Sequence, residues 1–180
     1  MGLRAFVALE LDREARQRLQ TAVEQLRPTL RGVKWVRPEG IHLTLRFLGD
    51  SEPDRLERLR PQLAEAAAQC PAGAADLTGL GLFPERGAPR VLWVGLGLAA
   101  PVQALQAECD AAAVRCGFAP EPRRFAPHLT LGRWRERAPR PELPATTLGV
   151  ARLGALVLLR SELRPGGAVY TRLASFPLSG

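Results

Sequence analysis

The two histidines of the chain, His42 and His128, occur in the same tetrapeptide, His-Leu-Thr-Leu. Only eight of the 180 residues are threonine, so two unrelated histidines would each find one two positions later in about one chain in five hundred. An imidazole titrates near neutral pH, and a hydroxyl can donate to an anionic oxygen. The repeat therefore singles out two imidazoles and two threonine hydroxyls as the candidate functional groups.

Strand geometry would place the chemical groups of each motif on one face. Because residues two apart on a strand share a face, His42 and Thr44 point one way and the motif leucines point the other. The same alternation puts Arg46 on the face of His42 and Phe47 on the leucine face. We therefore expect Arg46 to reach the functional cleft and Phe47 to lie in the core.

The elements that must position these groups can be read from periodicity and from the turn residues. Apolar spacing and capping residues predict three helices, and β-branched and aromatic runs between turns predict eight strands. The helices span 13–30, 53–69 (capped by Ser51) and 101–116, and the strands span 3–11, 33–36, 41–48, 74–82, 90–98, 125–134, 150–163 and 168–178. The motifs lie 86 residues apart in a similar order of elements, which predicts one domain over 1–180 built of two interleaved lobes.

Charge and composition narrow the class of partner. The chain carries a formal charge of +7 with a pI near 10.8, and all but one of its 25 basic residues are arginine. This balance favours an anionic partner such as nucleic acid, although a GC-rich genome would give the same arginine bias. The sequence has three cysteines without metal-ligand spacing, no signal peptide and no apolar run of membrane length, which predicts a cytoplasmic protein. No long apolar surface stripe is left over for a subunit interface, so we expect a monomer.

Five stretches around and beyond the motifs resemble the two-histidine phosphoesterases. The resemblance is to the bacterial RNA 2′,3′-cyclic phosphodiesterase branch, also called 2′-5′ RNA ligase, and it runs the full length of the chain. The stretches are FVALEL at 6–11, IHLTLRFLGD at 41–50, GLGLFPERGAPRVLWVGL at 79–96, FAPHLTLGR at 125–133 and SELRPGGAVYTRLASFPL at 161–178.

The resemblance implies an α+β fold in which two antiparallel sheets flank a central cleft and helices cover the outer faces. It makes His42 the general acid and His128 the general base, with Thr44, Thr130 and Arg133 as ligands of the substrate phosphate. The implied reaction is hydrolysis of a terminal 2′,3′-cyclic phosphate on RNA, tRNA fragments included, or on a cyclic mononucleotide, to a 2′-phosphomonoester. The reverse reaction would be an ATP-independent 2′-5′ ligation. Two histidines without nearby paired carboxylates make no zinc site, so we expect neither a metal nor another cofactor.

Other interpretations remain open at this point. Trp35, Phe83 and Phe125 could stack on a nucleobase near the cleft, or they could simply pack in the core. The chain could also be a nucleotide- or RNA-binding module that has lost turnover, although intact histidine and threonine in both motifs argue against this. A third alternative is a phosphoesterase for a small cyclic nucleotide phosphate outside RNA.

Overall fold

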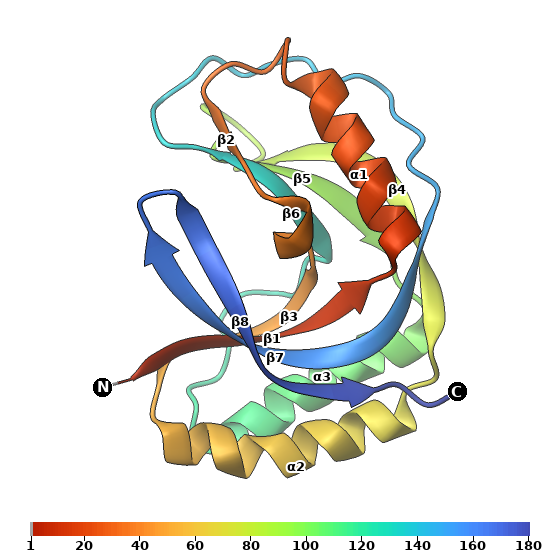
Figure 1. Cartoon of the computed structure of the whole chain (residues 1–180), viewed down its shortest axis with the longest axis vertical. Helices are drawn as coiled ribbons and strands as arrows, with labels where there is room; N and C mark the ends of the chain where they lie inside the picture. The colour runs from red at the N-terminus through yellow and green to blue at the C-terminus, as the bar shows by residue number, and fades with distance from the viewer. Residues whose placement is uncertain (1) are drawn as a thin grey trace.

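Eight strands form one continuous antiparallel sheet in the computed structural model, which describes residues 2–180 (Figure 1). Along the sheet the order is β2-β6-β5-β4-β7-β1-β3, and β8 pairs with β7 beside this path. The strands are β1 (Leu3–Leu11), β2 (Val33–Trp35), β3 (Leu43–Ser51), β4 (Gly73–Phe83), β5 (Val91–Gly97), β6 (His128–Trp134), β7 (Val150–Arg164) and β8 (Gly167–Pro177).

The sheet has two halves, and each half carries one motif strand. The first half contains β3, β1, β7 and β8, and the second contains β2, β6, β5 and β4. They are joined because the first residues of β7, 150–153, pair with 73–76 of β4, while 155–164 of β7 pair with β8. Figure 1 shows the sheet curving so that the two halves lie opposite each other. The two expected sheets are thus the two halves of one curved sheet.

Three α-helices lie outside this sheet: α1 (Arg13–Leu26), α2 (Pro53–Gln69) and α3 (Ala100–Arg115). Helices α2 and α3 contact each other and cover the first half, α2 against β7 and β8 and α3 against β3 (Figure 1). Helix α1 is attached beside the start of β7, where the guanidinium of Arg18 donates hydrogen bonds to the carbonyls of Leu148 and Val150.

Two helix ends differ from the expectation for a clear local reason. Helix α1 begins after its expected cap, Asp12, whose carboxylate accepts from the Ala15 amide at 3.3 Å, but it ends at Leu26 and not at residue 30. Pro28 follows, and its ring clashes with the carbonyl four residues back and offers no N–H. Helix α2 is not capped by Ser51: this residue ends β3, and its hydroxyl donates to the carbonyl of Gly49 at 3.0 Å.

The core lies on the helix-covered side of the sheet, and a smaller cluster lies on the other side. The motif leucines of both strands are buried in the main core, as the alternation predicts: Leu43, Leu45, Leu129 and Leu131. The smaller cluster on the inner face consists of Phe6, Ala8, Val157 and Leu159, with Tyr170 packed against it. Within residues 2–180, no helix is long and apolar enough to cross a membrane.

Candidate active site

Strand β3 contains a β-bulge within its motif. Opposite it on β1, Ala8 faces Thr44 and the preceding residue, Val7, faces Arg46, so Leu45 is an extra residue without a partner. A bulge of this kind moves the side chains that follow it to the other face of the strand, up to the next irregularity in the ladder. The bulge therefore decides which residues after Thr44 can share a face with the first histidine.

Strand β6 contains the same bulge at the equivalent position. Opposite it on β5, Trp93 faces Thr130 and Leu92 faces Gly132, so Leu131 is the extra residue. In both strands the second leucine of the motif is the unpaired one. The two motif copies therefore share a local backbone shape as well as a set of chemical groups.

The two bulges give residues 42–48 and 128–134 an identical pattern of burial. In each stretch the histidine and threonine are partly exposed, the residue five positions after the histidine is exposed, and the other four are buried. The exposed residues are Phe47 in the first stretch and Arg133 in the second. Each functional face therefore carries the motif histidine, the motif threonine and the residue at position five, which simple alternation would assign to the opposite face.

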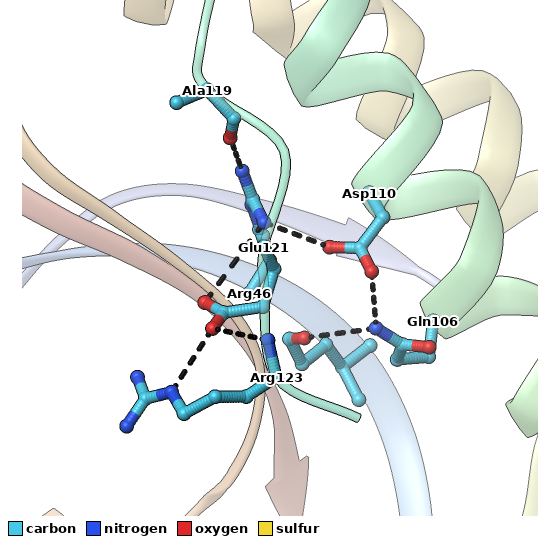
Figure 2. Close-up of polar contacts among 7 residues, drawn as sticks. Arg46, Gln106, Asp110, Ala119, Glu121 and Arg123 are labelled. Atoms are coloured by element: carbon cyan, nitrogen blue, oxygen red, sulfur yellow. Dashed lines mark hydrogen bonds and ion pairs between the residues drawn. The ribbon is translucent and has the colours of Figure 1, made fainter. Parts of the chain in front are cut away.

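The bulge overturns two expectations on β3. The side chain of Arg46 does not reach the face of His42: it is 4% exposed and lies on the helix side, with its guanidinium 3.4 Å from the carboxylate of Asp110 on α3 (Figure 2). Phe47 is not in the core but 52% exposed, and its ring lies 6.0 Å from that of Phe6 on the inner face.

Two aromatic rings enclose the imidazole of His42. Phe6 stacks on it at 4.8 Å between ring centroids and 26° between planes, and Tyr170 meets it edge-on at 5.1 Å. Burial lowers the pKa of His42 from 6.5 to about 4; a backbone hydrogen bond at Gly40 opposes this shift and the charge of Arg16 adds to it. The free imidazole is therefore neutral at pH 7.

His128 has a related environment in the other half. Phe83 meets its ring edge-on at 5.1 Å, and Trp93 lies 6.5 Å away. Burial also lowers the pKa of His128, against a backbone hydrogen bond at Ala126 and with the help of the charge on Arg133. Since the Ala126 carbonyl can only accept, the Nδ1 atom 2.7 Å from it carries the proton, and Nε2 keeps its lone pair.

Arg133 and Tyr170 connect the two histidine environments. Arg133 lies on β6, and its charge lowers the pKa of both His128 and Tyr170. Tyr170 lies on β8 and contacts the ring of His42. Burial raises the pKa of Tyr170, and the charges of Arg133 and Arg4 offset part of this rise. The phenol therefore remains a hydrogen-bond donor beside His42. In addition, β3 and β6 approach each other although they share no ladder.

The predicted site residues lie in two matched groups around this region. Thr44 and Thr130 are partly exposed beside their histidines, one on each motif strand, and Arg133 is exposed on the same face as His128 and Thr130. The structure thus brings four of the predicted groups, with Arg133, to the inner side of the sheet. Their roles in turnover remain predictions.

Phe125 does not lie on β6, which begins only at His128. It precedes the strand, is partly buried and packs against the main core, as does Trp35. Packing is therefore the better account of these two aromatic residues. Phe83, the third candidate, does lie against His128.

Phe6, Trp93 and Arg16 are neighbours of the histidines that the sequence interpretation missed. Trp93 lies flat on β4, because Gly81 has no side chain there: a Cβ at this glycine would be 2.1 Å from the indole ring. The alternation of glycine in the stretch GLGLF is the one signal that could have indicated a ring lying across the strand. Phe6 lies in the apolar run 5–9 of β1, and Arg16 lies on a helix, so neither has a distinguishing local pattern.

The arrangement is suited to proton transfer around an anion. Two neutral imidazoles, two hydroxyls and one guanidinium lie on the inner face of the sheet. An anion bound there would favour the protonated form of either imidazole. Among residues 2–180, no group of three or more histidine, cysteine, aspartate or glutamate side chains is placed to hold a metal ion.

Comparison with known proteins shows the family of the chain. The family model described as "LigT like Phosphoesterase" matches residues 9–93 and 96–170. RNA 2′,3′-cyclic phosphodiesterase of Methanothermobacter thermautotrophicus is 33% identical over 99% of this chain and 100% of its own length, and that of Thermus thermophilus is 38% identical over 99% and 91%. The crystal structure of TT0787 of Thermus thermophilus superposes with a TM-score of 0.86 at 34% identity, covering 99% of both chains. The chain belongs to the LigT-like phosphoesterase family.

Proposed function

We propose that the protein is an RNA 2′,3′-cyclic phosphodiesterase that opens a terminal 2′,3′-cyclic phosphate to a 2′-phosphomonoester without a metal ion. The observation that carries this proposal is the pair of matched motif faces, each presenting one neutral imidazole and one threonine hydroxyl. The curated relatives that match almost the whole chain bear this same name. The 2′ position of the product phosphate rests on the family resemblance.

Opening the cyclic ester requires two proton transfers. One group removes a proton from the attacking water, and the other gives a proton to the ribose oxygen that leaves the phosphorus; each such group contributes typically ~10²–10⁴ in rate. His128 suits the first role because its Nδ1–H is held by Ala126, so that Nε2 is available as a base. His42 suits the second role once the anionic substrate has raised its pKa, because an imidazolium with a low intrinsic pKa in its burial site is a strong acid.

The remaining groups of the site would hold the phosphate. The hydroxyls of Thr44 and Thr130 and the guanidinium of Arg133 can donate to the two non-bridging oxygens, on which negative charge builds in the transition state. One donor from each motif face and one cation would fix the phosphorus between the two imidazoles. If a 5′-hydroxyl RNA end replaced the water, the same ring opening, with the 3′ oxygen leaving, would form a 2′-5′ linkage without ATP.

The positive charge of the chain supports RNA as the substrate over a small cyclic nucleotide. We expect the protein to act as a cytoplasmic monomer, with residues 1–180 as one domain of two interleaved lobes. Sedimentation of the purified protein tests the oligomeric state.

The test of the proposed function is one incubation followed by phosphorus NMR. RNA ending in a 2′,3′-cyclic phosphate is incubated with enzyme and excess EDTA, and a 2′-phosphomonoester is the expected product. A 3′-phosphate would mean that the substrate lies reversed between His42 and His128, and activity that returns only with a divalent cation would contradict the metal-free mechanism. An oligonucleotide and a cyclic mononucleotide are compared in parallel, and a higher kcat/KM for the mononucleotide would favour the small-molecule alternative.

A further inference from the structure

The buried guanidinium of Arg46 lies at the centre of a partly buried polar cluster behind the first motif (Figure 2). Its Nη1 atom is 3.4 Å from Oδ1 of Asp110, on α3, and 4.0 Å from Oε2 of Glu121, in the segment that follows this helix. Its Nη2 atom donates a hydrogen bond to the carbonyl of Ala119. A single guanidinium thus connects the first motif strand with α3 and with the segment that leads to the second motif.

The cluster also supports the β-bulge of the first motif. A bulge leaves backbone groups without ladder partners, and such groups are costly when they are buried. Gln106, on α3, donates to the carbonyl of the bulged residue Leu45 at 3.4 Å and to Oδ2 of Asp110 at 2.8 Å. Arg46 follows the bulged residue directly. The carboxylate of Asp110 therefore binds both Gln106, which stabilises the bulge, and the guanidinium of Arg46.

The segment bound by Arg46 is short and stiff. Residues 119–127 have the sequence APEPRRFAP, in which three prolines each fix one backbone angle. Arg46 holds this segment at Ala119 and Glu121, and Glu121 is held in turn by hydrogen bonds from the amide and the side chain of Arg123. Phe125 packs against the main core.

The same segment ends at the second histidine. The carbonyl of Ala126, the penultimate residue of the segment, accepts the hydrogen bond from Nδ1 of His128. This bond decides which nitrogen of the ring carries the proton and how the ring is oriented. The chain therefore contains a continuous connection from the first motif strand to the imidazole of the second motif.

We propose that Arg46 is a positioning residue: through Ala119 and Glu121 it fixes the segment that carries Ala126, and so holds the imidazole of His128 in the orientation and tautomer in which Nδ1–H is bonded to the Ala126 carbonyl. The catalytic consequence rests on the proposed function, whereas the effect on the tautomer does not. A displacement of about 1 Å at a catalytic group can cost about 100-fold in rate. We expect removal of the guanidinium to lower kcat about 10- to 100-fold, with a smaller change in KM.

The first test uses Arg46→Met, which keeps the length of the side chain and removes its charge and its donors. Arg115→Met serves as the matched control, because Arg115 also forms an ion pair on α3, at 2.6 Å with Glu108, but lies exposed and away from the segment. Each variant is measured well below its own unfolding temperature. Wild-type kcat in Arg46→Met, or an equal loss in both variants, would overturn the proposal.

The second test reads the tautomer of His128 directly, by long-range ¹H–¹⁵N NMR above the pKa of the ring. The wild-type spectrum should show the proton on Nδ1 of His128, and Arg46→Met should shift the population toward the Nε2–H form while the signals of His42 stay unchanged. A change in stability alone would not move this equilibrium. Loss of kcat with an unchanged tautomer would contradict the positioning role.

A second variant protects the test against failure to fold. Arg46→Met leaves the partly buried carboxylates of Asp110 and Glu121 without their shared cation, which can destabilise the fold. The combination Arg46→Met, Asp110→Asn, Glu121→Gln removes all three charges together and should show the same shift at His128. If the wild type left a terminal 2′,3′-cyclic phosphate intact, the proposed function would fail, while the tautomer measurement would still decide the role of Arg46.

Discussion

The low pKa of His42 can be tested by opening one side of its aromatic enclosure. The ring lies between Phe6 and Tyr170, and the difference between 6.5 and about 4 corresponds to about 3 kcal/mol against the charged form. Tyr170 supplies one of the two enclosing rings. Tyr170→Ala should therefore raise the pKa of His42 by about one unit, since it returns one edge of the imidazole to water.

Tyr170→Phe is the matched control, because it keeps the ring against His42 and removes only the hydroxyl. Its His42 should titrate within a few tenths of a unit of the wild-type value. The assay is a ¹H NMR titration of the imidazole protons, which is simple here because the chain has two histidines and His128→Gln assigns them. A wild-type pKa near 6.5, or no response in Tyr170→Ala, would refute burial by the two rings as the cause.

The same shift has a consequence for stability. Because the pKa of His42 is lower in the folded chain than in the unfolded chain, unfolding takes up a proton between pH 6.5 and about 4. Stability from this group is fully present above pH 6.5 and is lost as the pH falls toward 4, by at most about 3 kcal/mol. Denaturant unfolding at a series of pH values gives the free energy of unfolding. In this window the free energy of unfolding should depend less steeply on pH for His42→Asn than for the wild type.

Three further predictions concern turnover and binding. His42→Ala and His128→Ala should each lower kcat by about two to four orders of magnitude with little change in folding, and a variant that keeps a tenth of the wild-type rate would remove its histidine from the mechanism. Thr44→Val and Thr130→Val keep the shape and lose one donor, so steady-state kinetics should show a loss of about ten- to a thousandfold; full activity would mean that other groups hold the phosphate. Oligonucleotide binding should weaken steeply with salt, and a flat plot of log K against log salt would indicate that only the terminal nucleotide is bound.

The order of elements and the functional faces could be predicted from local sequence signals. Period-two alternation indicated the motif strands, and the pairing of histidine with threonine two residues on identified the inner face. Helix α3 ends where Gly117 follows, with a φ of +88° that glycine adopts without strain. These features depend on a few neighbouring residues, so a single sequence is sufficient for them.

The features that escaped prediction depend on partners far along the chain. Alternation assumes a regular ladder, and nothing local shows that Leu45 is skipped by β1; Gln106, 61 residues away, is one of the groups that make the bulge favourable. The misassignment of Arg46 and Phe47 follows from this one omission. Only the family resemblance assigned Arg133 to the face of His128. On a regular strand, a residue five positions after His128 would lie on the opposite face.

Strand β7 has a mechanical consequence for the whole molecule. It runs unbroken from Val150 to Arg164, and at Gly154 its partner on one edge changes from β4 to β8. The two halves of the sheet are therefore joined through the first residues of this strand, so we expect a change in the separation of the two imidazoles to require a change in the sheet at this junction. A Cβ at Gly154 would meet no atom within 4 Å, so Gly154→Val can restrict the backbone at this junction without a clash.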